Sequence, residues 1–236
     1  MTSGQPEIWR INANGTDRTQ LTVNSGVSFG ISVSPLDGSL LFCSTQNGKH
    51  SLYLADSEGK NMRQIIEGTE DVFGTFTPNG QSIIFQRGLD NKTITLWRFD
   101  LKDKKLTQLT KTHSLHPIIS PDGSQIAHYF MEADADNLWR IKLISSTLGD
   151  FLNKINLPKE ATKRSMRWHP SGNFISQIAY QGDEIKLLLL PIQSTDAPQT
   201  YPLGKGELEW FEWSQDGKKI VVSQSIETQD IVLLSQ

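Results

Sequence analysis

The chain has 236 residues, a hydrophobic content of 36%, a charged content of 21% and a formal net charge of −3 at pH 7. This composition is ordinary for a folded domain, and the weak charge supplies no global field that would attract nucleic acid or an anionic membrane. No apolar run reaches the roughly 18 residues that a membrane-spanning helix needs. The single cysteine, Cys43, excludes an intrachain disulfide and a cysteine-based zinc site. We therefore expect no nucleic-acid partner and no direct insertion into a membrane.

Residues 7–22 predict two strands joined by a tight turn. Ile8–Ile11 alternates like a strand, Asn14-Gly15 favours a two-residue turn, and Thr19–Thr22 is interpreted as the returning strand. Similar pairs recur at 52–66 and 96–110, and a further copy opens at 138. We interpret residues 7–22 as the back half of a repeat whose front half is missing.

Five turn-forming segments divide the rest of the chain at intervals of about 43 to 49 residues: Ser34–Gly38, Thr77–Gly80, Ser120–Gly123, His169–Gly172 and Ser214–Gly217. In Ser120-Pro121-Asp122-Gly123 the proline presets φ at the second position, and the glycine suits the fourth. Apolar, β-rich runs flank each turn, which predicts hairpins. A period of this size is typical of repeat architectures, because a four-stranded propeller blade needs about 40–45 residues.

Each complete repeat is expected to contain four strands, one before the turn and three after it. In the first repeat we place them near Phe29–Val33, Leu40–Ser44, Leu52–Asp56 and Arg63–Ile66. The apolar residues one and three positions before each turn, such as Val33 and Ile31, are expected to pack one sheet on the next. In the third repeat, Phe151–Ile155 fits either a short helical turn or the fourth strand.

The predicted fold class is all-β: a β-propeller of four-stranded antiparallel blades, with about five and a half repeats visible. Such a chain is either six-bladed or a truncated arc of a larger propeller, and its last repeat should contain a strand at Ile231–Leu234. We expect a single domain over residues 1–236, with repeats at 7–22 (partial), 27–66, 72–110, 114–158, 164–203 and 206–236 (partial).

The motifs carry a family resemblance. A Ser-Pro-Asp-Gly turn, an Ile-Trp-Arg strand and a Gln-Leu-Thr ending resemble the TolB-like or WD-like propeller repeat, as in Ser120–Gly123, Ile8–Arg10 and Gln108–Thr110. Such repeats occur in a periplasmic envelope component, in propeller domains of prolyl-type peptidases and in sensor regions of bacterial receptor kinases. The segment from Phe211 to Leu234 is similar to the last blade of propellers that end bacterial serine/threonine kinases.

The candidate ligand site is the mouth of the central channel, which the first strands of the blades line in a propeller. Phe73, His116, Arg167 and Glu212 are the aromatic and polar residues expected there. His169 replaces the serine or threonine of its turn, where a ring nitrogen is expected to accept a backbone N–H. The acidic segment Glu132–Asn137 lacks the glycine and the distal glutamate of a calcium loop, so we expect no metal and no cofactor.

These features predict a non-enzymatic TolB-like binding module, the sensor or scaffold part of a larger bacterial envelope or signalling protein. The partner is expected to be a protein or peptide, or a small ligand at the channel mouth. The alternative is the propeller domain of a prolyl-type peptidase, or a propeller hydrolase or lyase. Met1–Pro6 shows no signal-peptide pattern. The location stays open: extracytoplasmic for a sensor fragment, and otherwise cytoplasmic.

Overall fold

The computed structural model describes residues 6–12, 14–23, 25–66, 70–89, 93–131, 139–193 and 196–225. Over these residues the secondary structure consists of β-strands, and none of it is a helix that could cross a membrane. The chain divides into two compact units, Met1–Asn156 and Leu157–Gln236, and the strands of each unit are given below in turn.

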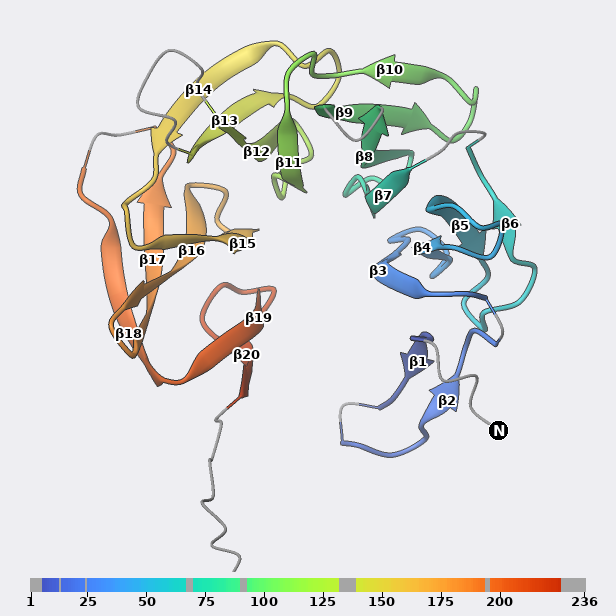
Figure 1. The fold of residues 1–236 in the computed structure, drawn as a ribbon, viewed down its shortest axis with the longest axis horizontal. Helices are drawn as coiled ribbons and strands as arrows, with labels where there is room; N and C mark the ends of the chain where they lie inside the picture. The colour runs from blue at the N-terminus through green and yellow to red at the C-terminus, as the bar shows by residue number, and fades with distance from the viewer. Residues whose placement is uncertain are drawn as a thin grey trace, which may run out of the picture. The chain divides into compact units, whose positions relative to one another are not determined.

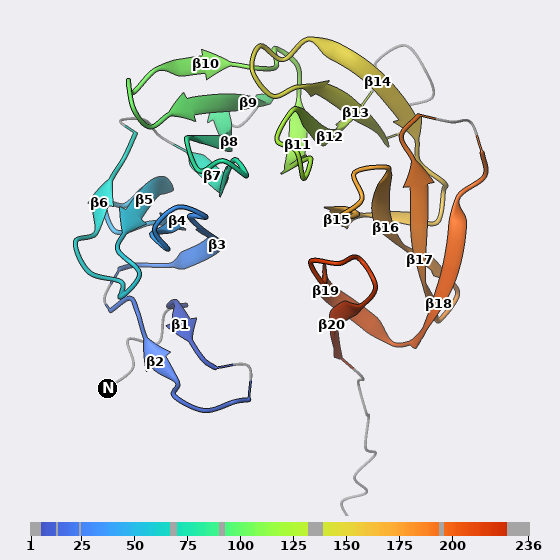
Figure 2. The ribbon, with the colours of Figure 1, turned by 180° about the vertical axis from the view of Figure 1, so that it is seen from behind.

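Unit 1 contains a short antiparallel pair followed by three four-stranded antiparallel sheets, which we call blades 1 to 3. Within this unit β3, β7 and β11 are the innermost strands of their blades, and β6, β10 and β14 are the outermost (Figures 1 and 2). The strands are β1 (Trp9–Arg10) and β2 (Thr19–Gln20); β3 (Ser28–Val33), β4 (Leu40–Ser44), β5 (Ser51–Ala55) and β6 (Arg63–Gln64) of blade 1; β7 (Asp71–Phe76), β8 (Ser82–Leu89), β9 (Thr93–Asp100) and β10 (Leu106–Gln108) of blade 2; and β11 (Ser114–Ile119), β12 (Gln125–Met131), β13 (Trp139–Ser145) and β14 (Phe151–Asn156) of blade 3.

Unit 2 contains one four-stranded antiparallel sheet, blade 4, and a following two-stranded hairpin. Blade 4 consists of β15 (Ala161–Trp168), β16 (Phe174–Gln181), β17 (Glu184–Pro191) and β18 (Gln199–Lys205), and the hairpin of β19 (Glu207–Trp213) and β20 (Ile220–Ser225). The four-stranded antiparallel blades confirm the predicted fold class. A sixth blade stays a prediction, and the strand expected at Ile231–Leu234 lies outside the described residues.

The structure decides between a helical turn and a fourth strand in the third repeat. Phe151–Asn156 pairs with β13 as the antiparallel strand β14, so the alternative of a helical turn is wrong. The extended backbone forms the outer edge of blade 3, where Phe151 and Leu152 stay exposed to solvent.

The turns owe their shape to a repeated side-chain contact. The hydroxyl of Ser120 accepts the N–H of Gln125 (2.9 Å) and donates to the carboxylate of Asp122 (2.6 Å), which lowers the pKa of Asp122. Gly123 completes the turn in the left-handed region, with φ of 76°. His169 fulfils its predicted role, because its Nδ1 accepts the N–H of Ser171 at 3.1 Å.

The core lies between neighbouring blades. Leu41 and Cys43 of blade 1 share one buried cluster with Ile83 and Phe85 of blade 2, and all four side chains are fully buried. Burial raises the pKa of the Cys43 thiol to about 12. A thiol that stays protonated behaves as the small hydrophobic residue that the sequence predicted.

The predicted packing face is wrong for blade 1. Ile31 and Val33 are 49% and 57% exposed, whereas the equivalent Phe76 of blade 2 is 8% exposed. The described residues before β3 supply only the strands β1 and β2, and the adjoining Ile8 and Leu21 pack on β4 and β5 rather than on β3. Ile31 and Val33 therefore have no inner strand to cover them among the described residues of unit 1.

Candidate functional site

Each innermost strand of unit 1 contains a bulge at the same position. The pairing register shifts between Phe29 and Ser32 in β3, between residues 72 and 75 in β7, and between residues 115 and 118 in β11. Inside the shift lies a residue with positive φ: Gly30 (66°), Phe73 (52°) and His116 (50°). A left-handed conformation costs a non-glycine residue about 1–2 kcal/mol, so Phe73 and His116 are held there by their surroundings. A bulge also re-aims the side chain that it carries.

The bulges gather aromatic rings from the three blades into one row. The Phe73 ring centroid lies 5.8 Å from that of Phe29 and 5.5 Å from that of His116. His50 lies beside Phe29 (5.8 Å) and Tyr129 beside His116 (6.1 Å), so we define the aromatic row as Phe29, His50, Phe73, His116 and Tyr129. Phe73, at its centre, is 41% exposed. Tyr129 is fully buried, so the ring surface open to a ligand is that of Phe73 and its partly exposed neighbours, and this surface suits apolar and planar groups.

Buried polar contacts fix the backbone on which the row stands. Arg87 makes two hydrogen bonds of 2.7 Å to the carboxylate of Asp71, at the start of β7, and Asp71 is 1% exposed. Burial raises the pKa of Asp71, and the guanidinium of Arg87 acts in the opposite direction. In β11 the backbone N–H of His116 donates to Oε1 of the buried Gln86. These contacts oppose relaxation of Phe73 and His116. If the backbone of β7 or β11 moved, the hydrogen bonds would break and a buried polar group would be left unsatisfied.

The other two predicted site residues contact each other in unit 2. Nε of Arg167 donates to Oε2 of Glu212 at 3.0 Å, and the guanidinium lies 5.6 Å from the ring centroid of Trp210. The Glu212 side chain is 48% exposed. An ion pair with such an exposed member contributes little to the free energy of folding. Either group can therefore leave its partner and bind a ligand with little loss of stability.

The structure thus brings together Phe73 with His116 in unit 1, and Arg167 with Glu212 in unit 2. The combined four-residue channel-mouth site stays a prediction. Sequence reasoning missed Phe29, His50 and Tyr129, which complete the aromatic row. The sequence did contain a signal that marks the centre of the row. Aligning the repeats places Phe73 and His116 at the position that Gly30 takes in the first repeat.

Among the residues that the structure describes, no group of three His, Cys, Asp or Glu side chains is arranged to hold a metal ion. His113 has a contact of its own, because its Nδ1 accepts the N–H of Ile94 at 3.2 Å. The acidic segment Glu132–Asn137 lies outside the described residues.

Comparisons with known proteins bear on the fold. In solved structures the chain is similar to TolB from Acinetobacter baumannii, with 21% identity and a TM-score of 0.70 over 87% of the chain and 50% of that protein. It is similar to a protein of Agrobacterium tumefaciens assigned to TolB, with 17% identity and a TM-score of 0.70 over 94% of the chain and 84% of that protein. An oligogalacturonate lyase from Vibrio parahaemolyticus shares 11% identity and a TM-score of 0.55 over 92% of the chain and 77% of the enzyme.

At these identities the structural likeness shows the fold alone. The chain spans half the length of the Acinetobacter TolB. A comparison with the sequences of curated proteins found no match. The family model described as "TolB beta propeller domain" matches residues 1–171, and the chain therefore belongs to the TolB β-propeller domain family.

Proposed function

We propose that the chain is a non-enzymatic interaction module that binds a protein or peptide segment on the aromatic row of unit 1. The observation that carries this proposal is Phe73, a bulky residue with φ of 52° that is 41% exposed. A strained residue that covered the core would be explained by packing. A strained residue that presents its ring to solvent between Phe29 and His116 is better explained by binding.

In this proposal the module is the sensor or scaffold part of a larger bacterial envelope or signalling protein. Its support is the TolB-like fold. A preformed aromatic row also suits binding without catalysis. Groups of a ligand can stack on its rings, and stacking requires no proton transfer.

Selection of peptides from a displayed library on the parent protein tests the proposal. The selected peptides should bind the Phe73→Ala variant at least about tenfold more weakly, as expected for an aromatic anchor. Phe151→Ala is the matched control, because Phe151 is an exposed phenylalanine (64%) on the outer strand β14 of the same unit. Peptides that bind both variants equally would contradict the proposal.

A stability measurement tests the strain separately. Because φ at residue 73 is positive, Phe73→Gly should be more stable than Phe73→Ala by about 1 kcal/mol, although both variants lose the ring. Equal stability of the two variants would mean that the backbone of β7 relaxes, and that Phe73 is not held against its preference.

The rival function is that of a propeller hydrolase or lyase, or of a prolyl-type peptidase propeller. It predicts that the parent turns over a substrate and that Arg167→Met or Glu212→Gln changes this turnover, whereas the binding proposal, which rests on the aromatic row of unit 1, predicts no turnover by the parent or by either variant. The lyase likeness at 11% identity supplies the substrate for this assay, oligogalacturonate.

A further inference from the structure

Neighbouring blades of unit 1 meet through a repeated close contact. In blade 1, a Cβ atom added to Gly59 would lie 2.0 Å from the carbonyl oxygen of Leu21, which follows β2. In blade 3, a Cβ atom added to Gly149 would lie 2.0 Å from the carbonyl oxygen of Leu109, which follows β10. In both places the turn between the third and fourth strands lies against the end of the preceding outer strand, and a glycine makes the approach feasible.

The junction between blades 1 and 2 differs from these two. The corresponding turn of blade 2, residues 101–105, contains no glycine, and Lys104 takes the positive φ of 55° there. Ile65, the equivalent of Leu21 and Leu109, lines an open hollow of about 620 Å³ together with Lys104. A second hollow of about 690 Å³ continues from it, since both are lined by Arg63 and Leu101. We call the two hollows the interblade groove.

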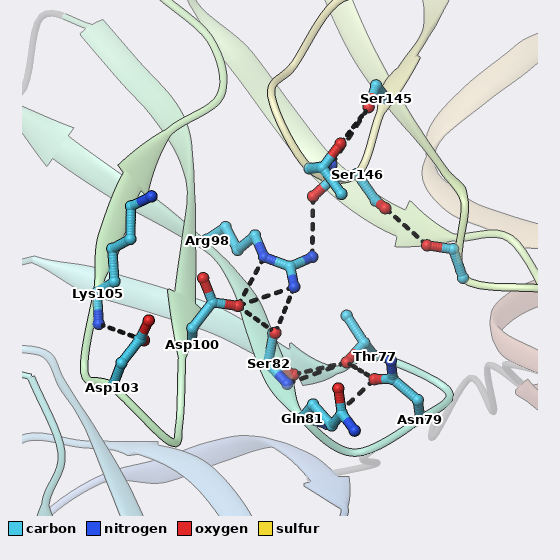
Figure 3. Close-up of polar contacts among 12 residues, drawn as sticks. Thr77, Asn79, Gln81, Ser82, Arg98, Asp100, Asp103, Lys105, Ser145 and Ser146 are labelled. Atoms are coloured by element: carbon cyan, nitrogen blue, oxygen red, sulfur yellow. Dashed lines mark hydrogen bonds and ion pairs between the residues drawn. The ribbon is translucent and has the colours of Figure 1, made fainter.

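The acidic groups of the interblade groove line only its second hollow, where Asp100 is paired with a cation and Asp37 and Asp103 accept backbone N–H groups. Figure 3 shows Asp100 bonded to Arg98, which also donates to the Ser146 carbonyl (3.2 Å), and Asp103 accepting the N–H of Lys105 (3.2 Å). Asp37 accepts the N–H of Ser39 at 3.1 Å.

Three basic groups of the groove, by contrast, form no ion pair with another described residue of the groove. Arg63, Lys102 and Lys104 line the groove and have no ion-pair partner within the described parts of the chain. The floor between them is apolar and includes Leu54 and Phe99. The hollow of about 620 Å³ therefore offers two basic side chains, Arg63 and Lys104, and no acidic one among its described lining residues, beside apolar surface.

We propose that the interblade groove is a second binding site, and that it takes an extended acidic peptide segment of a partner protein. Carboxylates of the segment pair with Arg63, Lys102 and Lys104, and its intervening apolar side chains lie on Leu54, Phe99 and Leu101. The alternation of a strand, with successive side chains on opposite faces, matches a groove whose rim is charged and whose floor is apolar. The site shares no residue with the aromatic row, so the two proposals fail independently.

The test uses the full chain and a short fluorescein-labelled peptide that alternates aspartate with leucine and phenylalanine. Fluorescence anisotropy should show saturable binding that weakens as salt is added, because the paired charges are exposed. A peptide with lysine in place of aspartate should bind at least about tenfold more weakly. Amide chemical-shift changes should concentrate at residues 63–66 and 99–106.

Charge reversal supplies the matched variants. Arg63→Glu combined with Lys104→Glu should weaken binding by about tenfold or more. Lys111→Glu combined with Lys159→Glu changes the net charge equally at exposed lysines outside the groove, and it should bind as the parent does. Unchanged binding by the first variant, equal binding of the lysine peptide, or shifts confined to other strands would each overturn the proposal. Binding of heparin with the same shifts, in the absence of peptide binding, would also overturn it, since charge alone would then suffice.

Discussion

His128 is expected to control how unit 1 responds to acid. Its side chain is fully buried in β12, and its Nδ1 lies 3.1 Å from the carbonyl oxygen of Tyr129. The carbonyl can only accept, so Nδ1 carries the proton, and Nε2 has no hydrogen-bond partner among the described residues. The ammonium of Lys142, which lies opposite His128 in the sheet, opposes a second positive charge.

These surroundings fix the direction and size of the effect. Burial first, and Lys142 to a smaller extent, lower the pKa of His128 from 6.5 to about 4. Between these two values the unfolded chain binds a proton that the folded chain does not, so acid favours unfolding. Stability is therefore complete above pH 6.5 and is lost as the pH falls toward 4. The difference of pKa corresponds to a loss of about 3 kcal/mol across that window.

Urea unfolding followed by circular dichroism, at pH values from 7.5 to 4.5, measures this loss. His128→Asn keeps a donor near the Tyr129 carbonyl but cannot be protonated, so the free energy of unfolding of this variant should depend less on pH, by about 2–3 kcal/mol. Ile126→Val is the control, because it shortens a fully buried side chain of the same strand without changing a titratable group, so its dependence on pH should match that of the parent. Parallel loss of stability in the parent and in His128→Asn would refute the reasoning.

Substitutions at three further positions test the turns and the blade contacts. Gly123→Ala should cost more than about 1 kcal/mol, because φ is 76° and the new Cβ would lie 3.3 Å from Cδ of Pro78; an unchanged melting temperature would contradict the hairpin. Ser120→Ala should cost about 1 kcal/mol and raise the pKa of Asp122, which carbon-detected NMR titration can follow. Arg98→Met should cost about 2 kcal/mol in urea unfolding, with partial recovery in Arg98→Lys, because an ammonium cannot replace the planar guanidinium.

The fold could be predicted from the sequence because its main signals are local. A turn such as Ser120–Gly123 needs only a hydroxyl, a proline and a glycine at fixed offsets, and the strands on either side alternate visibly. The packing between strands was harder to predict from the sequence. Ile31 and Val33 follow the same pattern as Phe76, yet they are exposed, since burial depends on which strands lie beside them.

The candidate site was predictable only in part for the same reason. Phe73 and His116 share one offset from their turns, which places them on corresponding inner strands. Phe29 and Tyr129 join them through bulges and positive φ values that sequence patterns do not encode. His50 joins through a loop contact with Glu70 at 3.1 Å, which depends on the path of the chain between blades.

The glycine contacts between blades show how a repeat protein can acquire a distinctive surface. Glycine stands where a turn closes against its neighbour, at Gly59 and Gly149, and Lys104 stands in the turn that leaves a groove. One nucleotide change in a glycine codon could therefore open a new groove while the other junctions keep the array folded. Blades related by duplication would then diverge in what they bind before they diverge in how they fold.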